Sequence, residues 1–156
     1  MTGVQTCALP ISEGKAKSIG VSNYTVRHLQ HLLKTCKVKP AVNQVELHVF
    51  LQQPELVDYC NKNGIVIEAY SPLAHGHGMD DSVLMSIAAK HKKSAAQIML
   101  RWCVQQGFVI LPKSVHPERV QQNANVFDFN LDAKDLEQIK TLDRNYRTCW
   151  DPTHVL

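Results

Sequence analysis

Short apolar runs alternate with longer amphipathic stretches along most of this 156-residue chain. Four of the runs are rich in β-branched residues, which is typical of buried strands in a parallel sheet. They lie at residues 18–21, 41–45, 65–70 and 108–111. The pattern therefore predicts four strands with helices between them.

The amphipathic stretches begin and end with residues that favour helix termini. Pro54 suits the first turn of a helix, and Gly64 follows the expected end of that helix. Ser94 and Gln97 form a capping-box pattern, and Asp132 opens a last helix with an apolar stripe. The alternation predicts an α/β fold with a parallel sheet.

Two architectures remain open from this pattern alone. One is a small doubly wound sheet, and the other is part of a β/α barrel. Both bind ligands at the carboxyl ends of their strands. The residues that follow the strands are therefore the candidates for function.

Composition narrows the class of protein. The hydrophobic content is 44%, the formal net charge is +3, and no apolar run approaches the length of about 18 residues that a membrane span needs. The basic residues are scattered, so we expect neither nucleic acid nor a membrane as a partner. Five cysteines form no CxxC pair. We expect them to be free thiols of a reducing compartment and the protein to be cytoplasmic.

The strand ends carry amide and hydroxyl groups, one aromatic ring and cations. These residues are Ser22, Asn23, Gln44, Tyr70, Lys113 and Arg119. Such a set suits a ligand that has an amide-bearing planar ring and a phosphate. Structural explanations stay open as well: Ser22 and Asn23 could cap a helix, Gln44 could be a satisfied amide, and Tyr70 a core ring.

Four segments resemble the second half of an aldo-keto reductase. They are GVSNY at 20–24, AVNQVELH at 41–48, GIVIEAYSPLA at 64–74 and ILPKSVHPERVQQN at 110–123. The resemblance implies the C-terminal half of a (β/α)8 TIM-type barrel, strands 5 to 8, with an NADP-dependent oxidoreductase fold. It also implies reduction of an aldehyde or ketone to an alcohol, with NADPH as cofactor and a small-molecule carbonyl substrate.

The same resemblance implies the residues of the nicotinamide end of the site. Ser22, Asn23 and Gln44 match positions that hold the carboxamide, and Tyr70 matches the ring that stacks on the nicotinamide. Trp150 lies in the C-terminal tail, which lines the substrate pocket in this family, so it is a candidate substrate contact.

The other residues match the phosphate and adenine end. Ser71 and Leu73 fall in the loop along the pyrophosphate, and Asn123 falls at the adenine. Three residues match the grip on the adenosine 2′-phosphate: Lys113, Ser114 and Arg119. Paired cations favour NADPH over NADH, because a dianionic phosphate needs compensating charge.

No catalytic residue is expected in this chain. The family uses a Tyr assisted by Lys, Asp and His as proton donor, and none of the motifs that carry them occurs. The chain alone is therefore expected to be inactive, and a non-catalytic module that binds NADP or a partner is the alternative function. Half a barrel leaves strand edges open, so we also expect self-association.

The sequence also predicts the domain bounds of the chain and the role of one histidine pair. Residues 1–12 are similar to the translation of a common sequencing-library adapter, so we expect a non-native leader and an N-terminal truncation. Residues 13–143 are the expected partial aldo-keto reductase barrel, and 144–156 a C-terminal tail or loop. His75 and His77 lack a third ligand nearby, so no metal site is expected.

Overall fold

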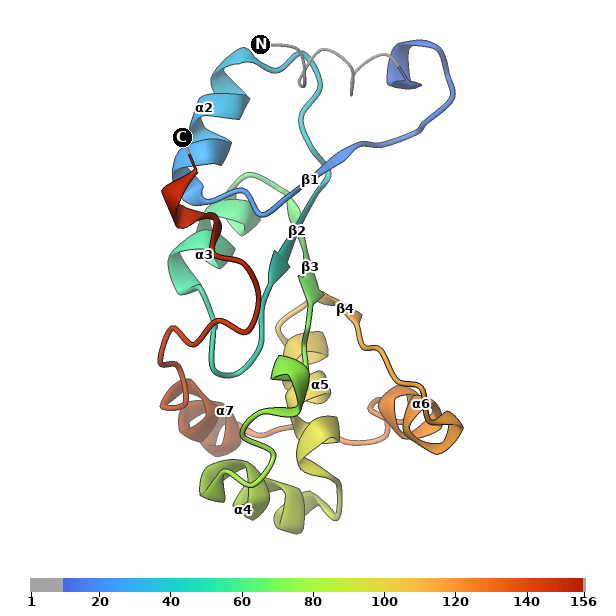
Figure 1. Ribbon diagram of the computed structural model, residues 1–156, viewed down its shortest axis with the longest axis vertical. Coiled ribbons are helices and arrows are strands. Elements are labelled where there is room, and N and C mark those ends of the chain that lie inside the picture. The colour runs from blue at the N-terminus through green and yellow to red at the C-terminus, as the bar shows by residue number, and fades with distance from the viewer. Residues whose placement is uncertain (1–9, 156) are drawn as a thin grey trace. The chain divides into compact units, whose positions relative to one another are not determined.

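The computed structural model describes residues 10–155 (Figure 1). Most of the leader expected over 1–12 lies outside the described residues, and 10–12 form a helical turn. The elements that follow are, in chain order, β1 (Gly20–Ser22), α2 (Val26–Thr35), β2 (Val42–Glu46), α3 (Pro54–Lys62), β3 (Val66–Tyr70), η1 (Ala74–Gly76), α4 (Ser82–His91), α5 (Ala95–Gln105), β4 (Val109–Leu111), α6 (Pro117–Ala124), α7 (Ala133–Lys140) and η2 (Pro152–His154).

All four predicted strands form, and they lie in one sheet in the order β1-β2-β3-β4. β1 pairs in parallel with β2, with Gly20 opposite Val42 and Ser22 opposite Gln44. Strands that follow one another in both the sequence and the sheet are typical of consecutive β/α barrel units. A doubly wound sheet would reverse its strand order at a switch point. The topology therefore selects the partial barrel.

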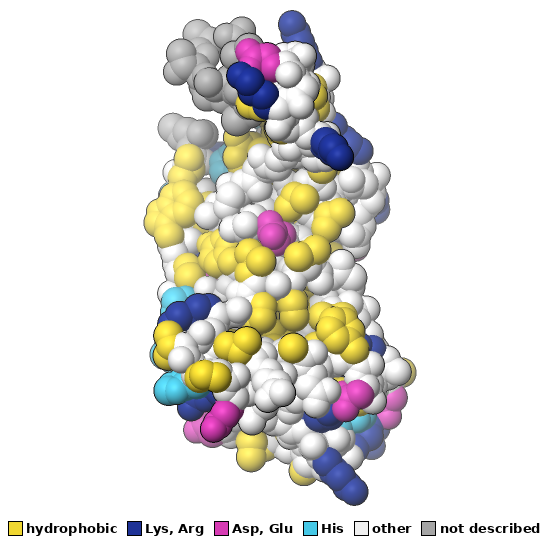
Figure 2. All heavy atoms as spheres, turned by 90° about the vertical axis from the view of Figure 1, so that its right-hand side faces the viewer, with side chains coloured by type: hydrophobic (Ala, Val, Ile, Leu, Met, Phe, Trp, Pro, Cys, Tyr) yellow, Lys and Arg dark blue, Asp and Glu magenta, His cyan; other side chains and the backbone are white. Residues whose placement is uncertain are grey.

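The strands are less buried than their apolar runs predicted. In β3, Ile67 and Ala69 are buried, whereas Val66 is 45% exposed. Val109 and Leu111 of β4 are exposed as well. Figure 2 shows one face of the molecule, on which hydrophobic side chains reach the surface in several clusters. Strands β3 and β4 are therefore only partly buried, which agrees with an open half-barrel.

The chain folds as two compact units. Unit 1 comprises Met1–Val45, Pro54–Glu68 and Asp151–Leu156, and unit 2 comprises Glu46–Gln53 and Ala69–Trp150. β2 and β3 each begin in unit 1 and end in unit 2. No helix among the described residues is long and apolar enough to cross a membrane.

In unit 1, a buried amide fixes the chain after β1. Asn43 is fully buried; its Nδ2 donates to the Tyr24 carbonyl at 2.9 Å, and its Oδ1 accepts from Tyr24 N at 3.4 Å. Helix α2 begins after Thr25, whose side chain accepts from His28 N at 3.4 Å. The cap of α2 is therefore Thr25 and neither Ser22 nor Asn23, so that structural explanation for the pair is wrong.

In unit 2, the predicted capping residues start their helices. Ser94 N donates to Gln97 Oε1 at 3.1 Å, and Gln97 N donates to Ser94 Oγ at 3.2 Å. Asp132 caps α7, and Pro117 occupies the first turn of α6. Both capping motifs are local, which explains why the sequence indicates them directly.

Helix α7 is joined to α4 through a buried carboxylate within unit 2. Asp135 is 1% exposed, and it accepts from Lys90 Nζ at 2.8 Å and from His91 Nε2 at 2.7 Å. The backbone N–H of Asp132 adds a third bond at 3.1 Å. Burial raises the pKa of the Asp135 carboxyl, but these hydrogen bonds outweigh burial and hold the pKa below its usual range.

Replacement of this carboxylate should destabilise unit 2. We expect Asp135→Asn to lower the free energy of unfolding by about 2 kcal/mol, because it removes a buried charge and replaces one of the two acceptor oxygens that bind Lys90 and His91 by an NH2 group. Because the folded-state pKa is depressed, the stabilisation is present above the usual Asp range and is lost as the pH falls through the lowered pKa. Urea unfolding at neutral and acidic pH measures the difference, which should shrink on acidification.

The matched control for this experiment is Glu137→Gln, an exposed carboxylate on the same helix. It should change stability by no more than about 0.5 kcal/mol. Equal stability of Asp135→Asn and Glu137→Gln at neutral pH would contradict the assigned role of Asp135.

Candidate functional site

The three residues predicted for the nicotinamide amide come together in unit 1. Ser22 Oγ donates to the Gln44 carbonyl at 3.0 Å, and Asn23 N donates to the same carbonyl at 2.8 Å. Gln44 is half-buried, and its Nε2 donates to Glu68 Oε2 at 3.0 Å. Glu68 therefore orients the Gln44 amide, and this pairing agrees with the structural explanation that Gln44 is a satisfied amide.

The predicted nicotinamide-stacking and pyrophosphate residues lie at the end of β3 and in the loop that follows. Tyr70 is half-buried, and its carbonyl accepts from Leu47 N at 3.3 Å within unit 2. Ser71 has a positive φ of 49°. The carbonyl of Leu73 accepts from Gly76 N at 2.8 Å, which closes a tight turn. The loop therefore bends sharply directly after the strand.

The predicted phosphate residues flank the start of α6. Lys113 and Arg119 are exposed and form no ion pair with any residue between 10 and 155. Arg119 and Asn123 are one helical turn apart, so they share a face of α6. Ser114 Oγ accepts from His116 N at 3.1 Å, which shapes the turn into the helix. The positive charge of two cations and of a helix N-terminus favours the binding of an anion.

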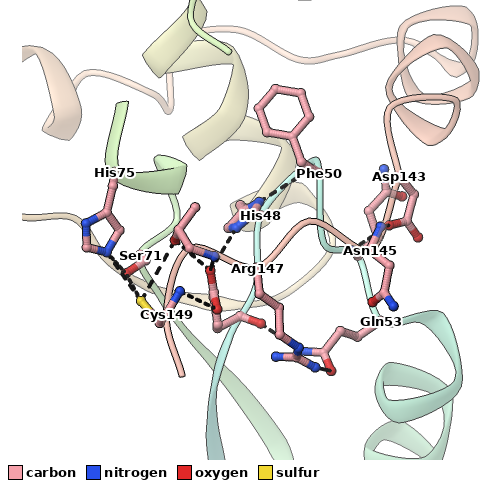
Figure 3. A network of polar contacts seen from close by, with 12 residues as sticks. His48, Phe50, Gln53, Ser71, His75, Asp143, Asn145, Arg147 and Cys149 are labelled. Atoms are coloured by element: carbon pink, nitrogen blue, oxygen red, sulfur yellow. Dashed lines mark hydrogen bonds and ion pairs between the residues drawn. The ribbon is translucent and has the colours of Figure 1, made fainter. Parts of the chain in front are cut away.

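A buried carboxylate that the sequence assigned no role forms a network in unit 2 (Figure 3). Glu46 is 0% exposed, and its Oε1 accepts from Thr148 N at 2.7 Å and Thr148 Oγ1 at 2.6 Å. Its Oε2 accepts from Cys149 N at 3.2 Å. Burial raises the pKa of Glu46, but the hydrogen bonds from Thr148, His48 and Cys149 outweigh burial and lower it.

His48 completes this network. Its Nδ1 accepts from Phe50 N at 3.3 Å, so its Nε2 carries the proton and donates to Glu46 Oε1 at 3.2 Å. His48 is fully buried, and burial is the main cause that lowers its pKa, against the opposing pull of Glu46. A neutral histidine therefore faces an ionised carboxylate.

Within unit 2, residues 144–149 of the tail are bound along residues 46–53, which run from the end of β2 to the start of α3. The carbonyl of Phe50 accepts from Arg144 N at 3.3 Å and from Tyr146 N at 3.0 Å. Gln53 accepts from Arg147 at 3.4 Å and donates to the Glu46 carbonyl at 2.7 Å. These contacts hold residues 144–149 beside 46–53 (Figure 3). Trp150 follows the bound segment and is 59% exposed.

Four side chains that this network and its neighbours use were assigned no function from the sequence: Glu46, His48, His75 and Cys149. Polar residues inside the apolar segment AVNQVELH were the available signal for the first two. His75 contacts Ser71 and Cys149, and the His77 ring packs edge-on against Tyr146 at 5.9 Å. Within residues 10–155, no group of three or more His, Cys, Asp or Glu is arranged to hold a metal ion.

Comparison with known proteins gives consistent matches. The model of the Aldo/keto reductase family matches residues 3–144. An uncharacterized oxidoreductase of Schizosaccharomyces pombe is 47% identical over 143 residues, covering 91% of this chain and 52% of the relative. Glyoxal reductase of Bacillus subtilis is 48% identical over 144 residues, covering 92% and 52%. The chain therefore spans about half the length of the curated relatives it matches.

Similar solved structures are aldo-keto reductases as well. An aldo-keto reductase from a deep-sea metagenome library is 41% identical with a TM-score of 0.91, and the match covers 97% of this chain and 57% of that chain. An aldo-keto reductase complexed with NADPH is 36% identical with a TM-score of 0.85, and the match covers 90% and 46%.

The Glu46 network makes a prediction about the tail. Glu46→Gln replaces one acceptor oxygen by an NH2 group, so the amide of Thr148 or Cys149 loses its partner. We expect trypsin to cleave after Arg147 about tenfold faster in this variant, because local opening becomes easier. Time-resolved proteolysis with mass spectrometry measures the rate.

Glu68→Gln is the matched control, since Glu68 bonds to Gln44 in unit 1 and has no hydrogen bond to the described part of the tail, residues 144–155. Cleavage after Arg147 should stay at the wild-type rate in this control. The role of Glu46 would be refuted if both variants were cleaved as slowly as the wild type.

Proposed function

This chain belongs to the aldo/keto reductase family, and from that premise we propose that it carries the NADPH-binding part of a carbonyl reductase. The reaction is the reduction of an aldehyde or ketone to an alcohol. NADPH would supply the hydride for that reaction. Because the chain spans about half of its relatives, the complete reaction is proposed for the whole reductase.

The pair of exposed cations at α6 is the observation that carries this proposal. Lys113 and Arg119 have no acidic partner among residues 10–155, so an anionic ligand would not have to displace one. A 2′-phosphate is dianionic, and the two cations offer it a fork of Arg donors and a Lys charge. A cofactor without the phosphate would leave both cations uncompensated.

The remaining predicted residues have donor sets that fit the rest of NADPH. Ser22, Asn23 and Gln44 offer hydroxyl and amide groups for the carboxamide in unit 1. Tyr70 offers a half-buried ring for stacking in unit 2. An NADPH complex among the similar solved structures supports this choice of cofactor.

The remaining predicted cofactor and substrate residues are assigned from the chemistry of their side chains. In unit 2, Ser71 and Leu73 would follow the pyrophosphate, Ser114 would join the phosphate grip, and Asn123 would meet the adenine. Trp150 is exposed directly after the anchored tail, so we assign it to the substrate. Its apolar ring suits a small-molecule carbonyl compound.

The proton donor is expected from outside these residues. The four tyrosines lie at 24, 59, 70 and 146, and none stands in the acid-donor motif of the family. The chain by itself is therefore proposed to bind cofactor without turnover. The four described cysteines are free, in line with a reducing, cytoplasmic setting. Exposed apolar strand residues such as Val109 support self-association of the chain.

Substitution of the two cations tests the proposal. We expect Lys113→Ala and Arg119→Ala each to weaken NADPH binding about tenfold, because each removes one charge-assisted contact to the phosphate. Cofactor fluorescence titration measures the dissociation constants. Lys134→Ala removes an exposed cation of α7 and should leave binding unchanged. If neither cation variant binds NADPH more weakly than Lys134→Ala, the phosphate assignment fails.

A further inference from the structure

The carboxylate of Glu68 has few partners for its position in unit 1. Glu68 is half-buried, and the one hydrogen bond that its side chain receives from residues 10–155 comes from Gln44 Nε2, at 3.0 Å. No Lys, Arg or His between residues 10 and 155 forms an ion pair with it. Removing a carboxylate from water costs free energy that hydrogen-bond donors or a cation must offset. Within the described part of the chain, Glu68 is therefore only weakly compensated.

Two carboxylates of unit 2 show what fuller compensation looks like. Asp135 accepts from a lysine at 2.8 Å and from a histidine at 2.7 Å. Glu46 accepts from two backbone N–H groups, a hydroxyl and an imidazole. Glu68 is less buried than either, but its one donor among residues 10–155 is a neutral amide. A positive charge that binds near Glu68 would therefore meet a carboxylate that no cation of the described chain neutralises.

The hydrogen bond joins this carboxylate to the residue that we assign to the nicotinamide carboxamide. A carboxylate only accepts, so the NH2 group of Gln44 faces Glu68. The Oε1 atom of the same amide has no hydrogen bond from residues 10–155 and can accept one from a ligand. The backbone of Gln44 is held by Ser22 and Asn23, which donate to its carbonyl at 3.0 and 2.8 Å. A ligand group that donates to Oε1 would lie two hydrogen bonds away from the Glu68 carboxylate.

We propose that the charge of Glu68 shifts the affinity of this site toward the oxidised cofactor, so that NADP⁺ gains binding free energy relative to NADPH. This inference rests on the proposed function. The nicotinamide ring carries a positive charge in NADP⁺ and is neutral in NADPH, whereas the carboxamide and the phosphates are the same in both. Contacts of Gln44 with the carboxamide therefore do not distinguish the two forms, but a nearby carboxylate does.

The range of the attraction and its direction both suit a reductase. Two hydrogen bonds of about 3 Å and the width of one amide group span roughly 8 Å, which is close to the Debye length at physiological ionic strength. Salt therefore screens the attraction only in part. By linkage, a site that favours the oxidised cofactor also makes loss of a hydride from the bound reduced cofactor more favourable. That hydride, with its two electrons, ends on the carbonyl carbon of the substrate.

Isothermal titration calorimetry of the full chain with NADP⁺ and, separately, with NADPH tests the inference. Glu68→Gln removes the charge but keeps an acceptor oxygen for the Gln44 amide. We expect this variant to bind NADP⁺ about fivefold more weakly than the wild type, because one attraction between opposite charges is lost. Its dissociation constant for NADPH should stay within about twofold of the wild-type value, which also verifies that the variant is folded.

Two further variants separate the local charge from other effects. Glu55→Gln removes an exposed carboxylate of unit 1 and should change neither dissociation constant. Glu68→Asp keeps the charge on a shorter side chain, so the ratio of the two dissociation constants should stay near the wild-type ratio. An unchanged ratio in Glu68→Gln, or an equal change in Glu55→Gln, would overturn this inference and leave the proposed function intact. Absence of saturable NADPH binding by the wild-type chain would overturn the proposed function and this inference together.

Discussion

A carboxylate that is removed from water must be hydrogen-bonded or become protonated, and this constraint acts at Glu46. Glu46 is fully buried at the end of β2, and donors from His48, Thr148 and Cys149 surround it. Three of these bonds come from the tail, about 100 residues further along the chain. The positions of Cys149 and of Trp150 in unit 2 therefore depend on one buried charge.

Strand β2 also contains a buried polar group without charge, the side-chain amide of Asn43 in unit 1. The buried amide of Asn43 bonds to both backbone groups of Tyr24, so the chain directly after β1 has a fixed course. Ser22 and Asn23 lie beside Gln44 in this conformation, and both donate to its carbonyl. β2 thus carries the predicted ligand contact Gln44, as well as two buried polar residues that position segments remote in sequence.

Local signals made much of the fold predictable. Ser94, Asp132 and Pro54 start their helices as expected, since each acts within one turn. The strand positions and the barrel-like order also agree with the sequence. The Glu46 network could not be predicted in this way, because its partners are separated by 102 and 103 residues. In the same way, nothing local indicated that Cys149 would meet His75.

We propose that this chain binds NADPH through two cations, Lys113 and Arg119, that contact the 2′-phosphate. Titration of the wild-type chain with NADPH and, separately, with NADH tests it most directly, with tryptophan fluorescence as the signal. We expect saturable binding, with NADPH bound about tenfold or more tightly than NADH, because only NADPH has a 2′-phosphate for Lys113 and Arg119. Equal affinities for the two cofactors, or no saturable binding of NADPH, would contradict it.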